Sequence, residues 1–101
     1  MGASKMKSII QKHNNHCFVC QIQKGMPLEE HHIFFGTANR KISEKYGLKV
    51  SLCYEHHRGT NGVHGKNGRQ LDIKLKKIAQ RRYEETHARE EFIKLIGKSY
   101  L

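Results

Sequence analysis

Three cysteines and a surplus of histidines carry the chemistry available to this sequence. Cys17 and Cys20 form a C-x-x-C pair, and Cys53 and His56 repeat that spacing further along the chain. Two ligand pairs with this spacing are typical of a tetrahedral zinc site, in which three sulfurs and one imidazole fill every position. We therefore predict a closed, structural zinc site.

The fourth zinc ligand has alternatives in the sequence. The matching two-residue gap favours His56, but His57 follows directly and His16 precedes Cys17. Three free cysteines buried as small apolar side chains are the alternative to any metal.

Several histidines exceed what this zinc needs. His31 and His32 are adjacent in an apolar segment, and a strand would direct their side chains to opposite faces. One imidazole could then hold a metal against a phosphate oxygen, while the other activates water from the far side of the phosphorus. A histidine doublet alone is usually a surface or core pair. Together with His57 and His64, it indicates a second, catalytic metal.

The composition indicates one small basic domain that binds polyanions. The chain has 101 residues, is 37% hydrophobic and contains no Trp, so its core is small and a metal would help to hold it together. Nineteen Lys and Arg against nine Asp and Glu give a formal net charge of +10. This excess favours nucleic acid, because each neutralised phosphate releases condensed counterions. A basic surface of the ribosomal-protein kind is the alternative.

Cysteine spacing and the lack of long apolar segments bear on location. Three cysteines cannot all pair as disulfides, and C-x-x-C spacing is typical of metal binding in a reducing compartment. The first eleven residues contain lysines but no apolar run, and no stretch is long enough for a membrane span. We expect a cytoplasmic protein without a secretory signal and without membrane contact.

Periodicity and turn residues predict an α+β domain with strands early and helices late. Residues 1–14 form a basic arm, either a short helix or a mobile segment, and residues 15–101 form one domain. The expected early elements are a zinc knuckle at 16–26, strands at 28–35 and 48–52, a helix at 38–46 ended by Gly47, a helical turn from Cys53 and a glycine-rich loop at 59–68. Two amphipathic helices follow as the main apolar cover, one carrying Leu71, Leu75, Ile78, Ala79 and Tyr83 and the other spanning 88–96 before Gly97.

These features together resemble the HNH, or ββα-metal, endonucleases. The likeness covers residues 15–65 and is carried by a strand with the doublet at 31–32, a second strand ending in Leu-Cys, and a helix opening with the histidines at 56–57. The stretch from His31 to His64, with Gly-Val-His-Gly at 62–65, looks most like phage-encoded members, including the RecA-dependent recombination nucleases. The resemblance implies a small zinc-braced ββα-metal finger with additional C-terminal helices at 69–97, encoded by a phage or prophage and acting in the cytoplasm of a bacterial host.

The resemblance also assigns roles and a cofactor. His31 takes the first motif position, which ligates the catalytic metal, His32 takes the general-base position, and His57 takes that of the helix ligand. His64 is then a third ligand or a phosphate contact, and His56 stands where the fourth zinc ligand is more usually a cysteine. The catalytic cation would be Mn²⁺, Mg²⁺, Ni²⁺ or Zn²⁺.

Two departures from the family pattern stand out. The middle Asn, which orients the general base, is absent because Leu48 occupies its place, so Asn39 or a backbone carbonyl would have to supply that hydrogen bond. Gly59 follows closely on His57, so the metal-bearing helix must be unusually short.

Six basic residues surround the expected site in the sequence and are candidates for contacts to the DNA backbone. They are Arg40, Lys41, Lys45, Arg58, Lys66 and Arg69. Backbone contacts position a duplex without reading bases, and no segment resembles a sequence-reading helix.

We therefore predict a metal-dependent endonuclease that hydrolyses DNA phosphodiester bonds with little sequence specificity. The resemblance implies a role in recombination, with a RecA-type filament as partner. RNA is a further possible substrate, because its phosphodiester backbone has the same chemistry as that of DNA. The alternative is a non-catalytic zinc-finger module that binds nucleic acid or a recombination protein.

Overall fold

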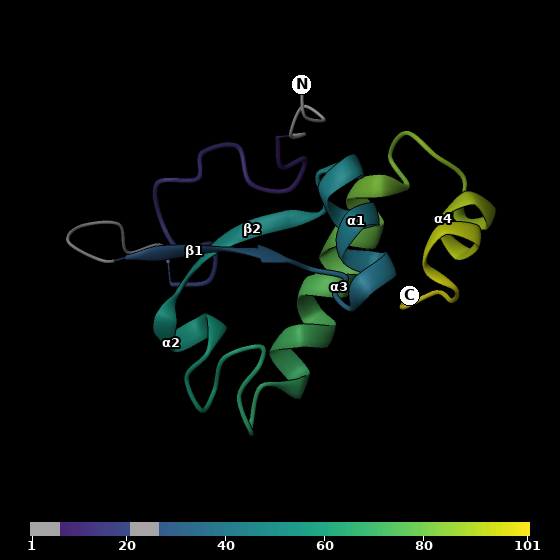
Figure 1. Ribbon diagram of the computed structural model, residues 1–101. Coiled ribbons are helices and arrows are strands. Elements are labelled where there is room, and N and C mark those ends of the chain that lie inside the picture. The colour runs from purple at the N-terminus through teal and green to yellow at the C-terminus, as the bar shows by residue number, and fades with distance from the viewer. Residues whose placement is uncertain (1–6, 21–26) are drawn as a thin grey trace.

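A computed structural model describes residues 7–20 and 27–101 of the chain. It contains an α+β arrangement, in agreement with the sequence prediction (Figure 1). The elements follow in the order β1 (Leu28–His32), α1 (Thr37–Tyr46), β2 (Lys49–Cys53), α2 (Tyr54–His57), α3 (Arg69–Tyr83) and α4 (Arg89–Ile96).

The two strands form an antiparallel sheet in which His31 pairs with Val50 and His32 with Lys49. β1 ends three residues before the predicted boundary at residue 35. The cause is Ser43 of α1, whose hydroxyl accepts a hydrogen bond from the Phe34 backbone N–H at 3.1 Å and donates one to the Phe34 carbonyl at 2.8 Å. Both backbone groups of that residue are thus satisfied by a side chain instead of by the ladder.

Glycines end two helices where the sequence predicted. Gly47 after α1 and Gly97 after α4 adopt the left-handed conformation, with φ of 72° and 107°. A residue with a Cβ is strained there, which is why glycine stops a helix at this position. The predicted helices at 38–46 and 88–96 are confirmed to within one residue at each end.

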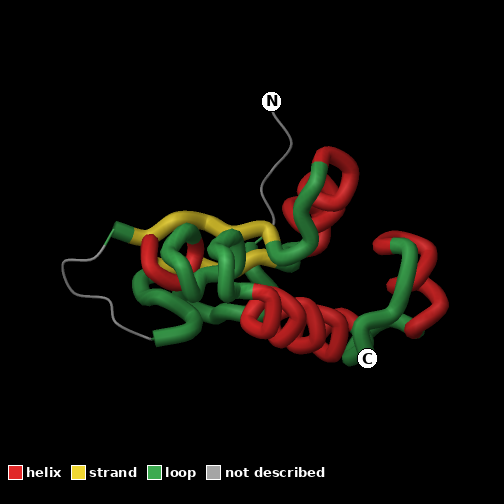
Figure 2. Tube along the Cα trace, turned by 90° about the horizontal axis from the view of Figure 1, so that it is seen from below, coloured by secondary structure: helices red, strands yellow, loops and turns green. Residues whose placement is uncertain are grey.

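One buried cluster joins the sheet to both C-terminal helices, but α4 packs against α1 and does not cover the metal-bearing unit as predicted. Leu75 and Ala79 of α3 and Phe92 of α4 belong to the same buried cluster as Val50 and Leu52 of β2. In Figure 2, α4 lies at the end of the molecule away from the strands. α1 contacts both β1 and α4, so it links that last helix to the sheet.

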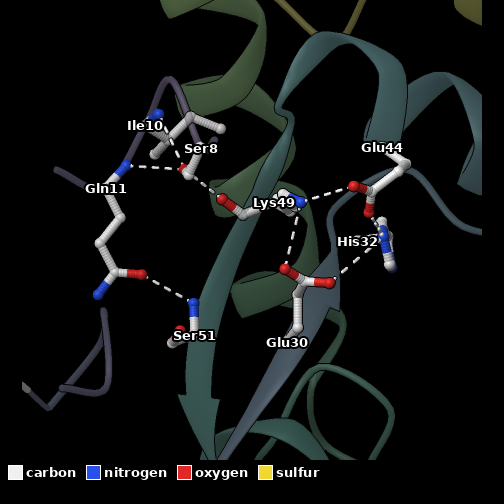
Figure 3. Close-up of polar contacts among 8 residues, drawn as sticks. All are labelled: Ser8, Ile10, Gln11, Glu30, His32, Glu44, Lys49 and Ser51. Atoms are coloured by element: carbon white, nitrogen blue, oxygen red, sulfur yellow. Dashed lines mark hydrogen bonds and ion pairs between the residues drawn. The ribbon is translucent and has the colours of Figure 1, made fainter. Parts of the chain in front are cut away.

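The described part of the N-terminal arm, residues 7–14, contains no helix and lies along the outer edge of β2. Ile9 donates its backbone N–H to the Gly47 carbonyl at 3.0 Å. Gln11 Oε1 accepts the backbone N–H of Ser51 at 2.7 Å (Figure 3). An open strand edge otherwise presents unpaired backbone groups, and the arm covers part of this edge without forming a strand. None of the helices in the described ranges is long and apolar enough to cross a bilayer.

Candidate metal centres

Three sulfurs and one imidazole converge at the end of the sheet where β2 passes into α2. The cluster consists of Cys17, Cys20, Cys53 and His56, the four residues that the sequence predicted. His56 Nδ1 lies 3.3 Å from Cys53 Sγ and 3.7 Å from Cys17 Sγ, and the Cys20 and Cys53 sulfurs lie 3.9 Å apart. A tetrahedral zinc with Zn–S bonds of about 2.3 Å requires sulfurs about 3.8 Å apart. The spacing of the four ligands therefore fits a zinc ion.

The other candidates for the fourth ligand lie elsewhere. His16 is outside the cluster, with its Nδ1 3.1 Å from the Asn15 side-chain oxygen. His57 points into a different group of histidines. Residues 21–26 of the predicted zinc knuckle are outside the described residues, whereas the turn that carries Cys17 and Cys20 is tied to β2 by a 2.8 Å hydrogen bond from Phe18 to the Ser51 carbonyl.

Backbone amides prepare one of these sulfurs for a metal. Burial raises the pKa of the Cys17 thiol, but hydrogen bonds from the backbone N–H groups of Cys20, Cys53 and Val19 outweigh it and lower the pKa to about 6. The thiolate is the form of cysteine that binds metals. A thiolate is thus stabilised at Cys17 by the fold itself.

A second cluster consists of three histidines, His31, His57 and His64. Their ring centroids lie 5.0 to 5.2 Å apart, and one nitrogen of each ring lies within 4.8 Å of the others. His31 and His57 are buried, whereas His64 is exposed. Three imidazoles that leave a side open to solvent form the kind of site that can hold a cation together with water or substrate.

A tightly folded loop brings His64 to the other two rings. The Val63 and His64 backbone N–H groups donate to the carbonyls of His56 and His57, at 2.9 and 3.0 Å. A Cβ at Gly65 would overlap the Gly59 carbonyl, so this close approach requires glycine. The shortness of α2, which spans four residues, agrees with the early glycine in the sequence.

A carboxylate orients one ring of the histidine cluster. Glu29 Oε1 lies 2.6 Å from His57 Nδ1 and accepts a further hydrogen bond from Arg58 Nε at 3.0 Å. His57 Nε2 is then the nitrogen left for a metal, in the carboxylate–histidine–metal arrangement common in metalloproteins. Burial, followed by the charges of His57 and His64, lowers the pKa of His31 to about 3, so this ring is neutral at ordinary pH.

The structure does not bring His32 into the three-histidine cluster. Its ring lies on the other face of the sheet, where its Nε2 is 2.8 Å from Glu44 Oε1 and 3.9 Å from Glu30 (Figure 3). The hydrogen-bond partner of His32 is therefore Glu44 of α1, and not Asn39 or a backbone carbonyl as the sequence suggested. Lys49 Nζ lies 2.8 Å from Glu44 and 3.2 Å from Glu30.

The side chains around His32 on this face are of types that bind metals, but the ammonium of Lys49 already lies between them. Glu30, His32 and Glu44 have the mutual spacing of a metal site. Lys49, whose side chain is 6% exposed, occupies that role, because its ammonium bridges the two carboxylates. Burial lowers the pKa of Lys49, but the hydrogen bonds that its ammonium donates to Glu44 and Glu30 outweigh this effect and raise the pKa above its ordinary value.

The six basic residues predicted to contact DNA are all exposed, in two groups. Arg40, Lys41 and Lys45 lie on α1, and the first two line an open cavity of about 490 Å³ together with His32 and Glu44. The second group consists of Arg58 directly after α2, Lys66 in the glycine loop and Arg69 at the start of α3. Figure 1 shows α1 and α2 at opposite ends of the sheet, so the two groups belong to different parts of the molecule.

Sequence reasoning missed several residues that surround the centres. Glu29 lies two positions before His31 and so shares its strand face, a signal that could have identified it. Phe35 is 41% exposed, and its ring centroid lies 5.0 Å from that of His64. Glu44 had no comparable signal, because its approach to His32 depends on how α1 packs.

Comparison with known proteins gives no family for this chain. Searches against family models, curated proteins and solved structures each gave no match. The features that bear on function are therefore the sulfur cluster and the three-histidine cluster.

Proposed function

We propose that this chain is a metal-dependent endonuclease of the HNH type that hydrolyses phosphodiester bonds of DNA. The observation that carries the proposal is the three-histidine cluster, with Glu29 behind His57 and an open side at His64. A net charge of +10 on the same chain supports a polyanionic substrate.

His31, His57 and His64 would hold the cation through neutral imidazole nitrogens. A divalent ion held there would supply Lewis acidity toward a phosphoryl oxygen and toward the leaving 3′-oxygen. Imidazole ligands suit Mn²⁺, Ni²⁺ and Zn²⁺ better than Mg²⁺, which prefers oxygen. We expect activity with several of these ions, and at least as much with Mn²⁺ as with Mg²⁺.

His32 would serve as the general base at the strand end. This role comes from the resemblance, because the ring of His32 lies on the sheet face opposite the three-histidine cluster, and it requires a phosphodiester that passes around the end of β1 from one face to the other. Glu44 accepts the hydrogen on His32 Nε2, which leaves Nδ1 free to accept the proton of the attacking water. The water oxygen bonds to phosphorus, the bond from phosphorus to the 3′-oxygen breaks, and a proton from solvent completes the 3′-hydroxyl.

The sulfur cluster would hold a structural zinc. Four ligands leave no open position, so the zinc would brace α2 and the N-terminal turn and take no part in the reaction.

The substrate is proposed to be DNA with little sequence preference, positioned by the two groups of exposed basic residues. RNA and RecA-coated DNA are to be tested as substrates beside free DNA. The resemblance further leads us to propose that a phage or prophage encodes the protein and that it acts in the bacterial cytoplasm.

A non-catalytic zinc-finger module that binds nucleic acid is the second candidate. The closed four-ligand cluster favours it, because such a cluster is sufficient for a binding module.

Metal counting and plasmid nicking separate the two functions. We expect one tightly held zinc and one exchangeable Mn²⁺ per chain, with Mn²⁺-dependent nicking of supercoiled plasmid. The variant His57→Ala should lose the Mn²⁺ and the nicking while retaining zinc, and His16→Ala, a histidine outside both centres, should retain all three. One zinc, no second metal and no nicking in the wild type would establish the binding module instead.

The general-base role has its own test. The variant His32→Ala should lose about 10²-fold in the cleavage rate, the usual scale for this kind of catalysis, with DNA affinity and metal content unchanged. A variant that cleaves at the wild-type rate would show that His32 is not the base.

A further inference from the structure

One oxygen of a carboxylate beside the histidine cluster has no hydrogen-bond partner. Within residues 7–20 and 27–101, the buried side-chain nitrogens and oxygens without a partner are His31 Nε2 and Asp72 Oδ1. A buried polar atom left unpaired is unfavourable, and in native proteins it usually marks a position for a water molecule or an ion. His31 belongs to the three-histidine cluster, so the proposed metal ligation explains why its Nε2 has no hydrogen-bond partner.

Asp72 lies in the first turn of α3 and is linked to that cluster through Lys76 and Phe35. Its other oxygen, Oδ2, accepts a hydrogen bond from Lys76 Nζ at 2.9 Å. The same ammonium lies 4.4 Å from the centroid of the Phe35 ring, which is 5.0 Å from the ring of His64 and 6.1 Å from that of His31. Asp72, Lys76 and Phe35 therefore form a continuous set of contacts that ends at the histidines.

We propose that Asp72 is a positioning residue of the three-histidine site, whose Oδ1 accepts a hydrogen bond from a water molecule bound to the cation there. The inference rests on the proposed function only in requiring that the histidines bind a divalent cation. Lys76 pairs with Oδ2, so Oδ1 is the oxygen of this carboxylate that is left without a partner. Outer-shell carboxylates of this kind typically strengthen metal binding by about 10- to 100-fold.

The test compares Mn²⁺ affinity, by calorimetry and by the EPR signal of free Mn²⁺, in the full zinc-loaded chain. The variant Asp72→Asn, which has nearly the same shape, should bind Mn²⁺ about 10- to 100-fold more weakly than the wild type. The matched control is Lys76→Met, which breaks the same ion pair but retains the carboxylate. This control should bind Mn²⁺ at least as tightly as the wild type, because a positive charge near the site has been removed.

Each outcome has a distinct meaning. No Mn²⁺ binding by the wild type would refute the proposed function itself. Normal binding by Asp72→Asn, or equal weakening in Asp72→Asn and Lys76→Met, would overturn the inference and leave the Asp72–Lys76 pair as a structural contact. If Asp72→Asn does not fold, Asp72→Glu retains the charge for Lys76 but displaces the oxygens. Unchanged Mn²⁺ affinity in that variant would overturn the inference as well.

Discussion

Removing one ligand from the sulfur cluster should abolish a large zinc-dependent stabilisation. Cys20 is the most suitable ligand to change, because it is only half-buried, whereas Cys17 and Cys53 are 0% and 2% exposed and belong to the core. Replacing Cys20 by Ala therefore tests the metal with the least disturbance of packing.

The magnitude follows from binding to the folded state alone. Free zinc at 100 times its dissociation constant stabilises the native chain by about 2.7 kcal/mol. One kcal/mol shifts the melting temperature of a domain of this size by about 4 to 8 °C. The wild type should therefore melt roughly 11 to 22 °C higher with zinc than with a chelator, because the closed four-ligand set forms only in the folded chain.

Thermal melts by circular dichroism, with zinc buffered at a defined free concentration, measure this difference. The variant Cys20→Ala should show little zinc-dependent shift, and His16→Ala, which leaves the cluster intact, should behave as the wild type. A wild-type melting temperature that is the same with zinc and with chelator would refute the reasoning. A full shift retained by Cys20→Ala would refute the ligand set.

Three further predictions concern the surrounding residues. The variant Glu29→Ala should weaken Mn²⁺ binding about 10- to 100-fold in a calorimetric titration, because His57 loses its orienting carboxylate; an unchanged affinity would contradict this. The variant Glu44→Gln should reduce the free energy of unfolding at neutral pH by about 2 kcal/mol, because it removes a charged hydrogen bond to the buried Lys49. Hydrogen bonds from Lys49 and then His32 lower the pKa of Glu44. The stabilisation by Glu44 is therefore present above the ordinary glutamate pKa and is lost as pH falls through the lowered value. Urea melts should show the unfolding free energies of the wild type and the variant becoming equal on acidification. The variant Gly65→Ala should lose Mn²⁺ binding but retain zinc by metal analysis, because the added Cβ forces the loop away from α2; retention of both metals would contradict the close approach.

Much of the candidate site could be predicted from the sequence, because its ligands occur at short, regular spacings. The sulfur cluster is drawn from two such pairs, and the strand alternation at His31 and His32 correctly separates their side chains onto two faces. The ends of α1 and α4 were predictable for a similar reason, since Gly47 and Gly97 specify a local backbone conformation.

The remaining features depend on packing between segments that are distant in the sequence. β1 ends early because Ser43, nine residues away, takes up the backbone groups of Phe34. Glu44 reaches His32, and Lys76 reaches Phe35 beside the histidine cluster, only because of the rotation and position of their helices. Helical periodicity identifies an apolar face, but it does not identify which polar residue at its margin will meet a given ring.

The short helix α2 supplies adjacent residues to both centres, His56 to the sulfurs and His57 to the histidine cluster. A single helical turn has little intrinsic stability, so its conformation is set by what its side chains bind. A metal at either centre would therefore restrict the backbone on which the other centre depends. Thermodynamic reciprocity then requires that zinc strengthen the binding of the second ion by the same factor by which that ion strengthens the binding of zinc. The protein would gain and lose its two metals cooperatively, and scarcity of one would reduce occupancy of both.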